Sequence, residues 1–353
     1  MNKGKQLNFE GKTIYCGLDV HKTNWKVNFG MDQRELGGFS QDPKAHLLKE
    51  YFKKNYPGAS LKVVYEAGFS GFGTQRSLTD LGIDCIVVNA ADVASKDKER
   101  KRKDDKRDAR KLRRELENGG LDAIFIPAMI SEHDRTLVRT RHHLVKDQTR
   151  NKNRIRHSLM FSGAPMEIQQ QRWSLKYLKQ VEEMEFGTPS LKRALAFEVE
   201  RYKSTRALIK EATNEIKKLS KEPAYADVQP YLQSIDGVGI INGMVIQTEI
   251  QDMDRFKSLD SLCGYAGLVP DISSTNDKTR VKGITHRCNE FLREAIIESS
   301  WMLIRKDPAM LMKYNEYRQR MNENKAIIRI DKHLLSRIRY VWKNKVKYER
   351  GIL

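Results

Sequence analysis

The first 40 residues alternate between hydrophobic and polar positions in a way that predicts strands. Residues 13–30 hold an apolar run that reaches Asp19, a short polar turn, and the segment WKVNF, whose apolar and polar positions alternate with period two. This pattern predicts a β-hairpin. A third strand is predicted near residues 34–41, RELGGFSQ.

Helical and strand patterns then take turns as far as residue 112. An Asp-Pro pair opens a helical pattern at residue 42, and Pro57 and Gly58 end it. The next predicted elements are a buried strand, a helix, a second buried strand and a basic helix, at residues 60–67, 71–82, 83–90 and 101–112. Three strands followed by helix, strand, helix, strand and helix is the order of a ribonuclease H type mixed sheet, so we predict an α/β fold for this part.

The middle of the chain predicts two long helices. Residues 137–160 keep Leu, Val and Ile at helical spacing and crowd Arg and Lys on the other faces, which predicts a long basic helix. Residues 190–222 have heptad-like apolar positions. This second helix is suited either to pairing with another helix or to packing on its own domain.

The last third predicts a mostly helical domain. Gly237, Val238 and Gly239 form a turn between two apolar helices, as in a helix-hairpin-helix. Such a turn either offers N–H groups to phosphates or allows tight packing. A polar, basic loop is predicted before a buried helix that ends near residue 304. We therefore expect three domains, at residues 1–130, 131–225 and 226–353.

Charge and composition point to a polyanionic partner. The 353 residues include 65 Lys and Arg against 46 Asp and Glu, a formal net charge of +19. Nucleic acid is the favoured partner, and a membrane surface is the weaker alternative because no apolar run approaches the roughly 20 residues of a spanning helix. The start of the sequence lacks an apolar signal core and the four cysteines form no CxxC pair, so we expect a cytoplasmic protein with reduced thiols and no structural zinc.

Acidic residues inside the basic regions raise a question of their own. In a ribonuclease H type sheet, Asp19 and Glu66 lie on adjacent central strands, and Asp105 and Asp108 share one face of the following helix. Four such carboxylates repel one another unless they are protonated or bind cations, and oxygen ligands suit Mg²⁺ or Mn²⁺. We expect two ions about 4 Å apart, as in two-metal phosphodiester chemistry.

Simpler interpretations remain for the neighbouring groups. The charged run around residue 105 is either a solvated helix or a cation site beside a phosphate-binding surface. Asp104 is expected to be a surface or helix-start residue. His21, close to Asp19, either touches substrate or is a turn residue without a role.

At this point the sequence resembles a known family, the DEDD transposases of the insertion sequence 110 family, which are described as bridge-RNA-guided recombinases. YCGLDVHKTNW, VVYEAGFSGFGTQRSLTDLGIDCIVVNA and KDDKRDARKL are similar to its RuvC-like domain. SIDGVGIINGMVIQTEI, FKSLDSLCGYAGLVPDISS and THRCNEFLREAIIESSWMLI are similar to its carboxy-terminal transposase domain. The resemblance spans nearly the whole chain and places the four family acids on Asp19, Glu66, Asp105 and Asp108.

The resemblance also implies a serine nucleophile that forms a covalent phosphoserine with DNA. The family carries it in a Ser-Gly pair, but PDISSTNDK has no glycine and places Thr275 and Asn276 at that spacing. Ser274 is therefore the first candidate, Ser273 the second, and Thr275 a more hindered third. Loss of the nucleophile in this copy is a further alternative.

The resemblance implies nucleic-acid partners and self-association. The expected partners are double-stranded DNA of element ends and target, a noncoding guide RNA, and further copies of the chain in a homodimer or homotetramer, within a bacterial or archaeal cytoplasm near the nucleoid. The candidate contacts to nucleic acid are Lys101, Arg102, Lys103, Arg107, Arg110, Arg139, Arg141, Arg150, Lys152, Arg154, Arg156, Arg280, Lys282 and Arg287. Of these, Arg280, Lys282 and Arg287 are also candidates to neutralise transition-state charge.

The favoured function is thus a magnesium-dependent DNA transposase and recombinase. One rival is a junction-resolving or RNA-cleaving nuclease that uses the four acids with water as nucleophile. A second rival is a non-catalytic nucleic-acid-binding protein.

Overall fold

The computed structural model describes residues 8–93, 105–165, 167, 172–186, 188–275 and 278–351. The side chains of residues 105, 106, 272–275 and 278–282 lie outside this description. The chain divides into two compact units, Met1–Ile126 and Pro127–Leu353. We describe each unit by itself, and the predicted division near residue 225 stays a prediction.

The amino-terminal unit is built on one five-stranded sheet. Its strands are β1 (Thr13–Val20), β2 (Trp25–Met31), β3 (Arg34–Gln41), β4 (Ser60–Glu66) and β5 (Asp84–Val88). The spatial order is β3-β2-β1-β4-β5. The first three strands pair antiparallel, and β1, β4 and β5 run parallel. This is the predicted ribonuclease H type arrangement, and the predicted fold class is confirmed.

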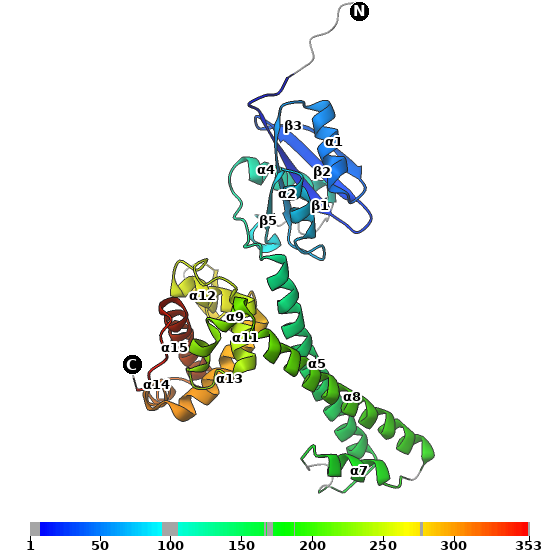
Figure 1. Cartoon of the computed structure of the whole chain (residues 1–353), viewed down its shortest axis with the longest axis vertical. Coiled ribbons are helices and arrows are strands. Elements are labelled where there is room, and N and C mark those ends of the chain that lie inside the picture. Colours follow the sequence, from blue (N-terminus) through cyan, green and yellow to red (C-terminus); the bar gives the residue numbers. More distant parts are fainter. Residues whose placement is uncertain are drawn as a thin grey trace, which may run out of the picture. The chain divides into compact units, whose positions relative to one another are not determined.

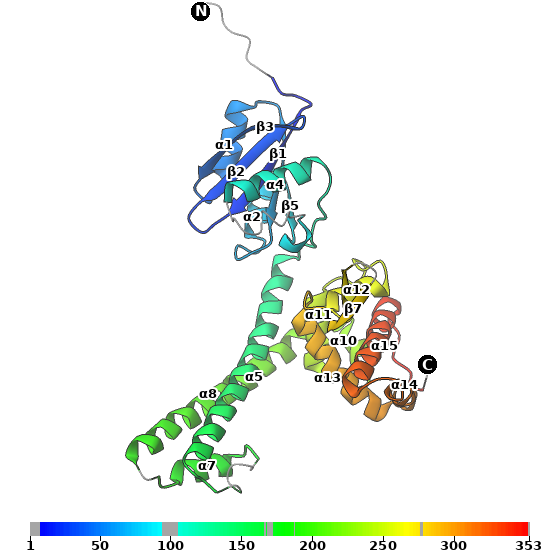
Figure 2. The same ribbon diagram turned by 180° about the vertical axis from the view of Figure 1, so that it is seen from behind.

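Helices cover both faces of the sheet (Figures 1 and 2). Helices α1 (Ala45–Asn55) and α2 (Gly73–Asp80) belong to one face, where apolar side chains of every second strand position form the larger core. Helix α4 (Asp105–Glu117) covers the other face, over a smaller cluster that includes Val64 and Leu112. A single 3₁₀ turn, η1 (Ala90–Asp92), follows β5.

Gly17 lets α4 lie close against the middle of the sheet. A Cβ at this position would lie 2.0 Å from the backbone oxygen of Ala109 and 2.6 Å from the backbone nitrogen of Arg113. Neither atom can move without the helix, so a larger residue on β1 would push α4 away. The absence of a side chain at Gly17 therefore fixes the height of α4 above the strand that carries Asp19.

The second unit begins with a long helical hairpin, visible in Figures 1 and 2. Helix α5 (Met129–Phe161) packs along α8 (Pro189–Leu219), and α7 (Leu175–Glu183) lies at the far end. There Ile155, Leu159, Tyr177 and Val199 share a small core. Helix α8 therefore pairs with a helix of its own unit, which is compatible with both interpretations of the heptad-like helix.

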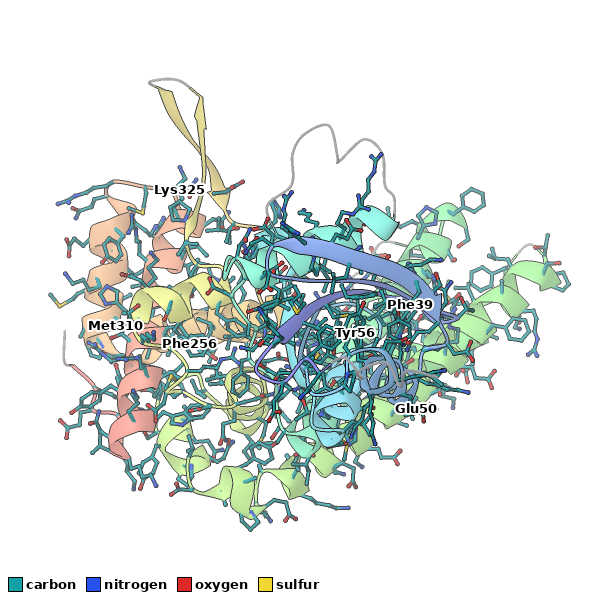
Figure 3. All side chains as sticks on the ribbon, turned by 90° about the horizontal axis from the view of Figure 1, so that it is seen from above. Phe39, Glu50, Tyr56, Phe256, Met310 and Lys325 are labelled. Atoms are coloured by element: carbon teal, nitrogen blue, oxygen red, sulfur yellow. The ribbon has the colours of Figure 1, made fainter. Side chains whose placement is uncertain are left out.

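The rest of the second unit is a helical domain around a large core. Its helices are α9 (Pro223–Ala226), α10 (Gln229–Gln233), α11 (Ile240–Ile250), α12 (Leu259–Ala266), α13 (Glu290–Lys306), α14 (Pro308–Arg318) and α15 (Glu323–Asn344). Phe256 and Met310, labelled in Figure 3, belong to this core. Among the residues described, no helix is both long and apolar enough to cross a membrane.

The prediction of a loop after residue 269 is wrong. Strands β6 (Pro270–Thr275) and β7 (Lys278–Ile284) form an antiparallel hairpin between α12 and α13. In Figure 3 this hairpin, drawn in yellow, projects away from the helices of its own unit. The sequence pattern did not reveal these strands, because the segments PDISST and KTRVKGI are short and rich in polar residues.

Candidate active site

Asp19 and Glu66 lie level with each other on adjacent parallel strands. Gly17 pairs with Val64 and Leu18 with Tyr65, so the next position on β1 is Asp19 and the next on β4 is Glu66. Leu18 and Tyr65 face the core under α1 and α2. Since strand side chains alternate, both carboxylates belong to the opposite face, which α4 covers.

Helix α4 starts on this same face. Ala109 and Leu112 are buried apolar positions of this helix, and Arg113 is buried as well. Asp108 precedes Leu112 by four residues and therefore lies on the same side of the helix, one turn nearer its start. Asp105 is the first residue of the helix, at i−4 from Ala109, but its side chain lies outside the described part, as does the whole of Asp104. The backbone thus brings the segments of all four predicted acids to one face.

The carboxylate oxygens on this face are of the chemical type that binds a hard divalent cation. Asp19, Glu66 and Asp108 are carboxylates from three neighbouring elements, and oxygen donors of this type are the ligands of Mg²⁺ and Mn²⁺. Among the side chains that the structure describes, no group of three or more His, Cys, Asp or Glu is close enough to hold a metal ion. The elements are in place, and the fourth carboxylate is not among the described side chains.

His21 contacts the first acid directly. Its Nε2 lies 3.0 Å from Oδ2 of Asp19. The turn that holds it is closed by a hydrogen bond from the His21 backbone N–H to the backbone oxygen of Asn24, 3.0 Å. His21 thus lies beside a predicted metal ligand, and whether it touches substrate stays a prediction. Protonated, its imidazole would offset the negative charge of Asp19.

Lys26 and Ser40 are residues of this face that the sequence reasoning missed. Asp19 pairs with Lys26 across β1 and β2, and Lys26 pairs with Ser40 across β2 and β3. Trp25 and Val27 face the opposite core, so Lys26 shares the face of Asp19. Counting strand positions outward from the turn at residues 21–24 would have paired Lys26 with Asp19.

The predicted nucleophiles lie on the β6–β7 hairpin of the second unit. Ser273 pairs with Arg280, Ser274 with Thr279, and Thr275 with Lys278. The candidate serines and the candidate cation Arg280 are therefore strand neighbours, but their side chains, and that of Lys282, are outside the described part. Which of the three hydroxyls serves as nucleophile stays a prediction.

The base of this hairpin is anchored to α13 by a set of hydrogen bonds. The guanidinium of Arg293 donates to the backbone oxygens of Ala266, at 3.2 Å, and of Thr285. The Asn289 backbone N–H donates to the Tyr265 backbone oxygen at 2.9 Å, and the Thr285 backbone N–H donates to Val269 at 3.0 Å. Both ends of the hairpin are thus tied to one rigid helix.

A buried ion pair extends this anchor to the long helix α5. Arg139 donates two hydrogen bonds of 2.7 Å to the carboxylate of Glu249, which is fully buried. The amide of Asn289 donates to the same carboxylate at 2.7 Å and to the hydroxyl of Tyr265 at 2.9 Å. Arg139 also lies over the ring of Phe291, 4.4 Å from its centroid. The structure therefore places Arg139, a predicted nucleic-acid contact, in a network around a buried carboxylate, with 34% of its side chain exposed.

The glycine turn before α11 is explained by packing. Gly237 has φ +88°, and a Cβ there would lie 2.3 Å from the backbone oxygen of Ser299 on α13. Val238 is buried in the core of the unit. Of the two interpretations of the turn, tight packing accounts for Gly237 without a phosphate.

Several of the other predicted cations have partners within the protein, and some of these are also exposed. Arg141 donates to Thr213 at 2.8 Å, Arg110 pairs with Glu35 at 2.8 Å, and Arg150 pairs with Asp147 at 2.6 Å. Lys152 and Arg156 lie over the aromatic rings around Trp173 at the end of the helical hairpin. The exposed side chains are those of Arg107, Arg110, Arg150, Arg154, Arg156 and Arg287. Lys101, Arg102 and Lys103 lie outside the described residues.

Comparison with known proteins assigns both units to one family. Residues 16–162 match the model of the IS110-type DEDD transposases, described as "Transposase". Residues 229–315 match the model described as "Transposase IS116/IS110/IS902 family". The chain belongs to the IS110 family of transposases. The predicted resemblance is thus confirmed, and the family matches cover both the acid-bearing sheet and the β6–β7 hairpin.

Individual proteins that this IS110-family chain is similar to are also named as transposases. It is 32% identical to the putative transposase y4qE of Sinorhizobium fredii over 242 residues, which are 67% of this chain and 57% of that protein. It is 24% identical to the transposase for insertion sequence element IS1533 of Leptospira borgpetersenii, over 68% of this chain and 70% of the relative. It is 26% identical to the transposase for insertion sequence element IS1111A of Coxiella burnetii, over 79% of this chain and 77% of that relative.

Proposed function

We propose that this protein is a DNA transposase and recombinase that cuts and joins DNA with a divalent-metal site and a serine nucleophile. The observation that carries the proposal is the level placement of Asp19 and Glu66 on the central strands of a ribonuclease H type sheet, in a chain of the IS110 family. Asp105 and Asp108 at the start of α4 complete the proposed metal-binding set.

The acids would hold two Mg²⁺ or Mn²⁺ ions, which supply charge stabilisation for the attacking and leaving oxygens of a phosphodiester. The chain itself supplies the orientation. His21 holds one oxygen of Asp19, and the close contact of α4 at Gly17 sets the distance between the helix acids and the strand acids. A carboxylate fixed in this way loses less conformational entropy when it binds a cation.

The proposed nucleophile is Ser274, with Ser273 and Thr275 as alternatives. Its hydroxyl gives up a proton and its oxygen forms a bond to a backbone phosphorus, while the bond from phosphorus to one DNA oxygen breaks and that oxygen takes up a proton. The product is a phosphoserine that preserves the energy of the broken bond for joining. The anchored base of the β6–β7 hairpin supports this role, since a nucleophile needs a fixed position.

The proposed partners are double-stranded DNA, a noncoding guide RNA and further copies of the chain, in the cytoplasm. The net charge of +19 and the exposed arginines on α5 support binding to nucleic acid. Self-association is supported by exposed apolar side chains along the helical hairpin, among them Phe161 and Phe197.

A covalent adduct between protein and DNA would test the proposal. Purified protein is incubated with element-end DNA, its flanking noncoding RNA and Mg²⁺, and the products are separated under denaturing conditions. We expect an adduct in the wild type and in the control Ser60→Ala, which changes an exposed serine of β4, but not in Ser274→Ala. Ser273→Ala and Thr275→Ala test the alternatives.

The outcomes separate the three candidate functions. An adduct that only one of the three hydroxyl variants abolishes identifies the nucleophile. Metal-dependent cutting without an adduct in any lane contradicts the serine mechanism and favours a nuclease that uses water. Binding without cutting, unchanged in Asp19→Asn, favours a protein that only binds nucleic acid.

A further inference from the structure

A polar cavity lies on the α4 face of the sheet, one strand away from the proposed metal site. Its volume is about 400 Å³. Lys26 and Asn28 of β2 and Ser40 of β3 line it from the sheet, and Ala109 and Arg110 of α4 line it from the other side. Asp19, Glu66 and Asp108, the three predicted acids whose side chains are described, do not line this cavity, which shares the face of the proposed metal site.

Lys26 brings hydrogen-bond donors to the cavity. Its ammonium group donates one hydrogen bond, of 2.8 Å, to the hydroxyl oxygen of Ser40. Among the side chains within the described ranges, no carboxylate lies within ion-pair distance of Lys26. An ammonium group has three donors, and a serine hydroxyl that accepts a hydrogen bond still has its own proton to donate. The pair therefore offers donors to a ligand oxygen.

The other charges that line the cavity largely cancel. Arg110 forms an ion pair with Glu35, 2.8 Å from Nε to Oε2, and Asn28 donates to Glu35 at 2.8 Å. Partial burial raises the pKa of Glu35, but the hydrogen bonds from Asn28 and Arg110 and the charges of Arg110 and Arg113 outweigh it and keep this pKa below its ordinary value. Glu35 is therefore ionised at neutral pH and neutralises Arg110. Among the described side chains that line the cavity, the net charge left is the single positive charge of Lys26, which suits one negative group.

The cavity residues Lys26 and Ser40 lie in line with the predicted acids Asp19 and Glu66 across the sheet. Glu66, Asp19, Lys26 and Ser40 form one row across β4, β1, β2 and β3, by the register of the paired strands. Neighbouring strands lie about 4.8 Å apart, so Lys26 is about one strand spacing from Asp19 and Ser40 about two. A chain of phosphates that passes over the acids in the direction of this row would bring its next phosphate over Lys26 and Ser40.

We propose that this cavity is a binding subsite for a backbone phosphate of the DNA strand, next to the phosphate that reacts at the acids. The inference rests on the proposed function, because it takes the acids as the place where DNA is cut. Lys26 and Ser40 act as positioning residues: they bind the neighbouring phosphate and so fix the reacting one, without touching it.

Lysine footprinting tests the proposal on the full-length protein. Protein is treated with an amine-acylating reagent in the presence of a chelator, with and without saturating single-stranded DNA, and modification at each lysine is measured by mass spectrometry. Lys62, on β4 at the far end of the sheet from Glu66 and half exposed, is the matched control. We expect DNA to protect Lys26 and to leave Lys62 unchanged.

Salt dependence of binding supplies a second measurement. Loss of one phosphate contact lowers the slope of log affinity against log salt concentration by about one. We expect this reduction in Lys26→Gln, a smaller one in Ser40→Ala, and none in Lys62→Gln.

Each outcome has a defined meaning. DNA that binds without protecting Lys26, or an unchanged slope in Lys26→Gln, overturns the subsite and leaves the proposed function intact. Protection of Lys26 by inorganic phosphate alone as strongly as by DNA assigns the cavity to free anions and overturns the DNA subsite. Failure of the wild type to bind DNA at all contradicts the proposed function itself and the subsite with it.

Discussion

Replacing Asp331 with asparagine should change how the stability of the second unit depends on pH. Asp331 lies on α15 and is fully buried in the helical domain. Neither of its carboxylate oxygens has a hydrogen-bond partner within the described structure. Burial raises the pKa of Asp331 from its ordinary value of 3.8 to about 7, and the nearby hydroxyl of Ser300 lowers it by a smaller amount.

The size of the effect follows from this shift. A difference of about three pKa units at 1.36 kcal/mol per unit corresponds to about 4 kcal/mol. Between pH 4 and 7 the folded protein holds a proton at Asp331 that the unfolded chain has lost, so the free energy of unfolding falls as pH rises through this window. Below pH 4 Asp331 is protonated in both the folded and the unfolded chain and does not lower the free energy of unfolding. Above pH 7 it is ionised in both, and the full destabilisation is present.

Urea denaturation at a series of pH values checks this reasoning. The difference in unfolding free energy between Asp331→Asn and wild type should move in favour of the variant by about 3 to 4 kcal/mol between pH 4.5 and 8. The control Asp254→Asn changes an exposed carboxylate that pairs with Lys343 of α15. The same difference in unfolding free energy should change by under about 1 kcal/mol for this control. A difference between Asp331→Asn and wild type that is the same at both pH values would refute the assigned burial cost.

Two further substitutions test the packing that supports the site. Gly17→Ala should destabilise the first unit by at least about 2 kcal/mol in thermal or urea unfolding, because its Cβ would meet the backbone of α4. The control Gly73→Ala has open space around it and should be neutral or slightly stabilising. Equal stability of both variants would show that α4 does not rest on Gly17. Glu249→Gln should cost about 3 kcal/mol and speed hydrogen exchange at the Thr285 amide, because it removes the buried carboxylate that pairs with Arg139. Glu294→Gln, whose partners are the exposed Lys146 and the partly exposed His142, should cost under about 1 kcal/mol. Unchanged exchange in Glu249→Gln would contradict the anchoring of the hairpin base.

Local patterns were sufficient to predict the amino-terminal fold. The alternation in WKVNF, the apolar runs before Asp19 and Glu66, and the Pro and Gly residues between elements follow from strand and turn chemistry alone. Once the strand order was predicted, parallel pairing placed Asp19 beside Glu66. Lys26 was missed because it looks like an ordinary polar position of a half-buried strand, and only the register reveals its partner.

Contacts between distant segments could not be predicted in this way. Arg139 looks like one more cation on a basic helix, but its partner Glu249 is 110 residues away on an apolar helix. The β6–β7 hairpin was missed because its strands are short and rich in polar residues, so that no run of alternating apolar positions indicates them. The pairing of the second long helix with α5 was one of two interpretations, since a heptad pattern does not say which helix it meets.

Binding of Mn²⁺ to the purified protein, measured by calorimetry at neutral pH without DNA, tests the central claim most directly. The variants Asp19→Asn and Glu66→Gln each remove one charge from the proposed metal site, and Asp84→Asn removes one from the exposed start of β5. We predict that wild type and Asp84→Asn bind Mn²⁺ alike, and that Asp19→Asn and Glu66→Gln bind it more weakly by at least the roughly tenfold that loss of an outer-sphere partner causes. Equal Mn²⁺ binding in all four proteins, or none in the wild type, would contradict a metal site at these acids.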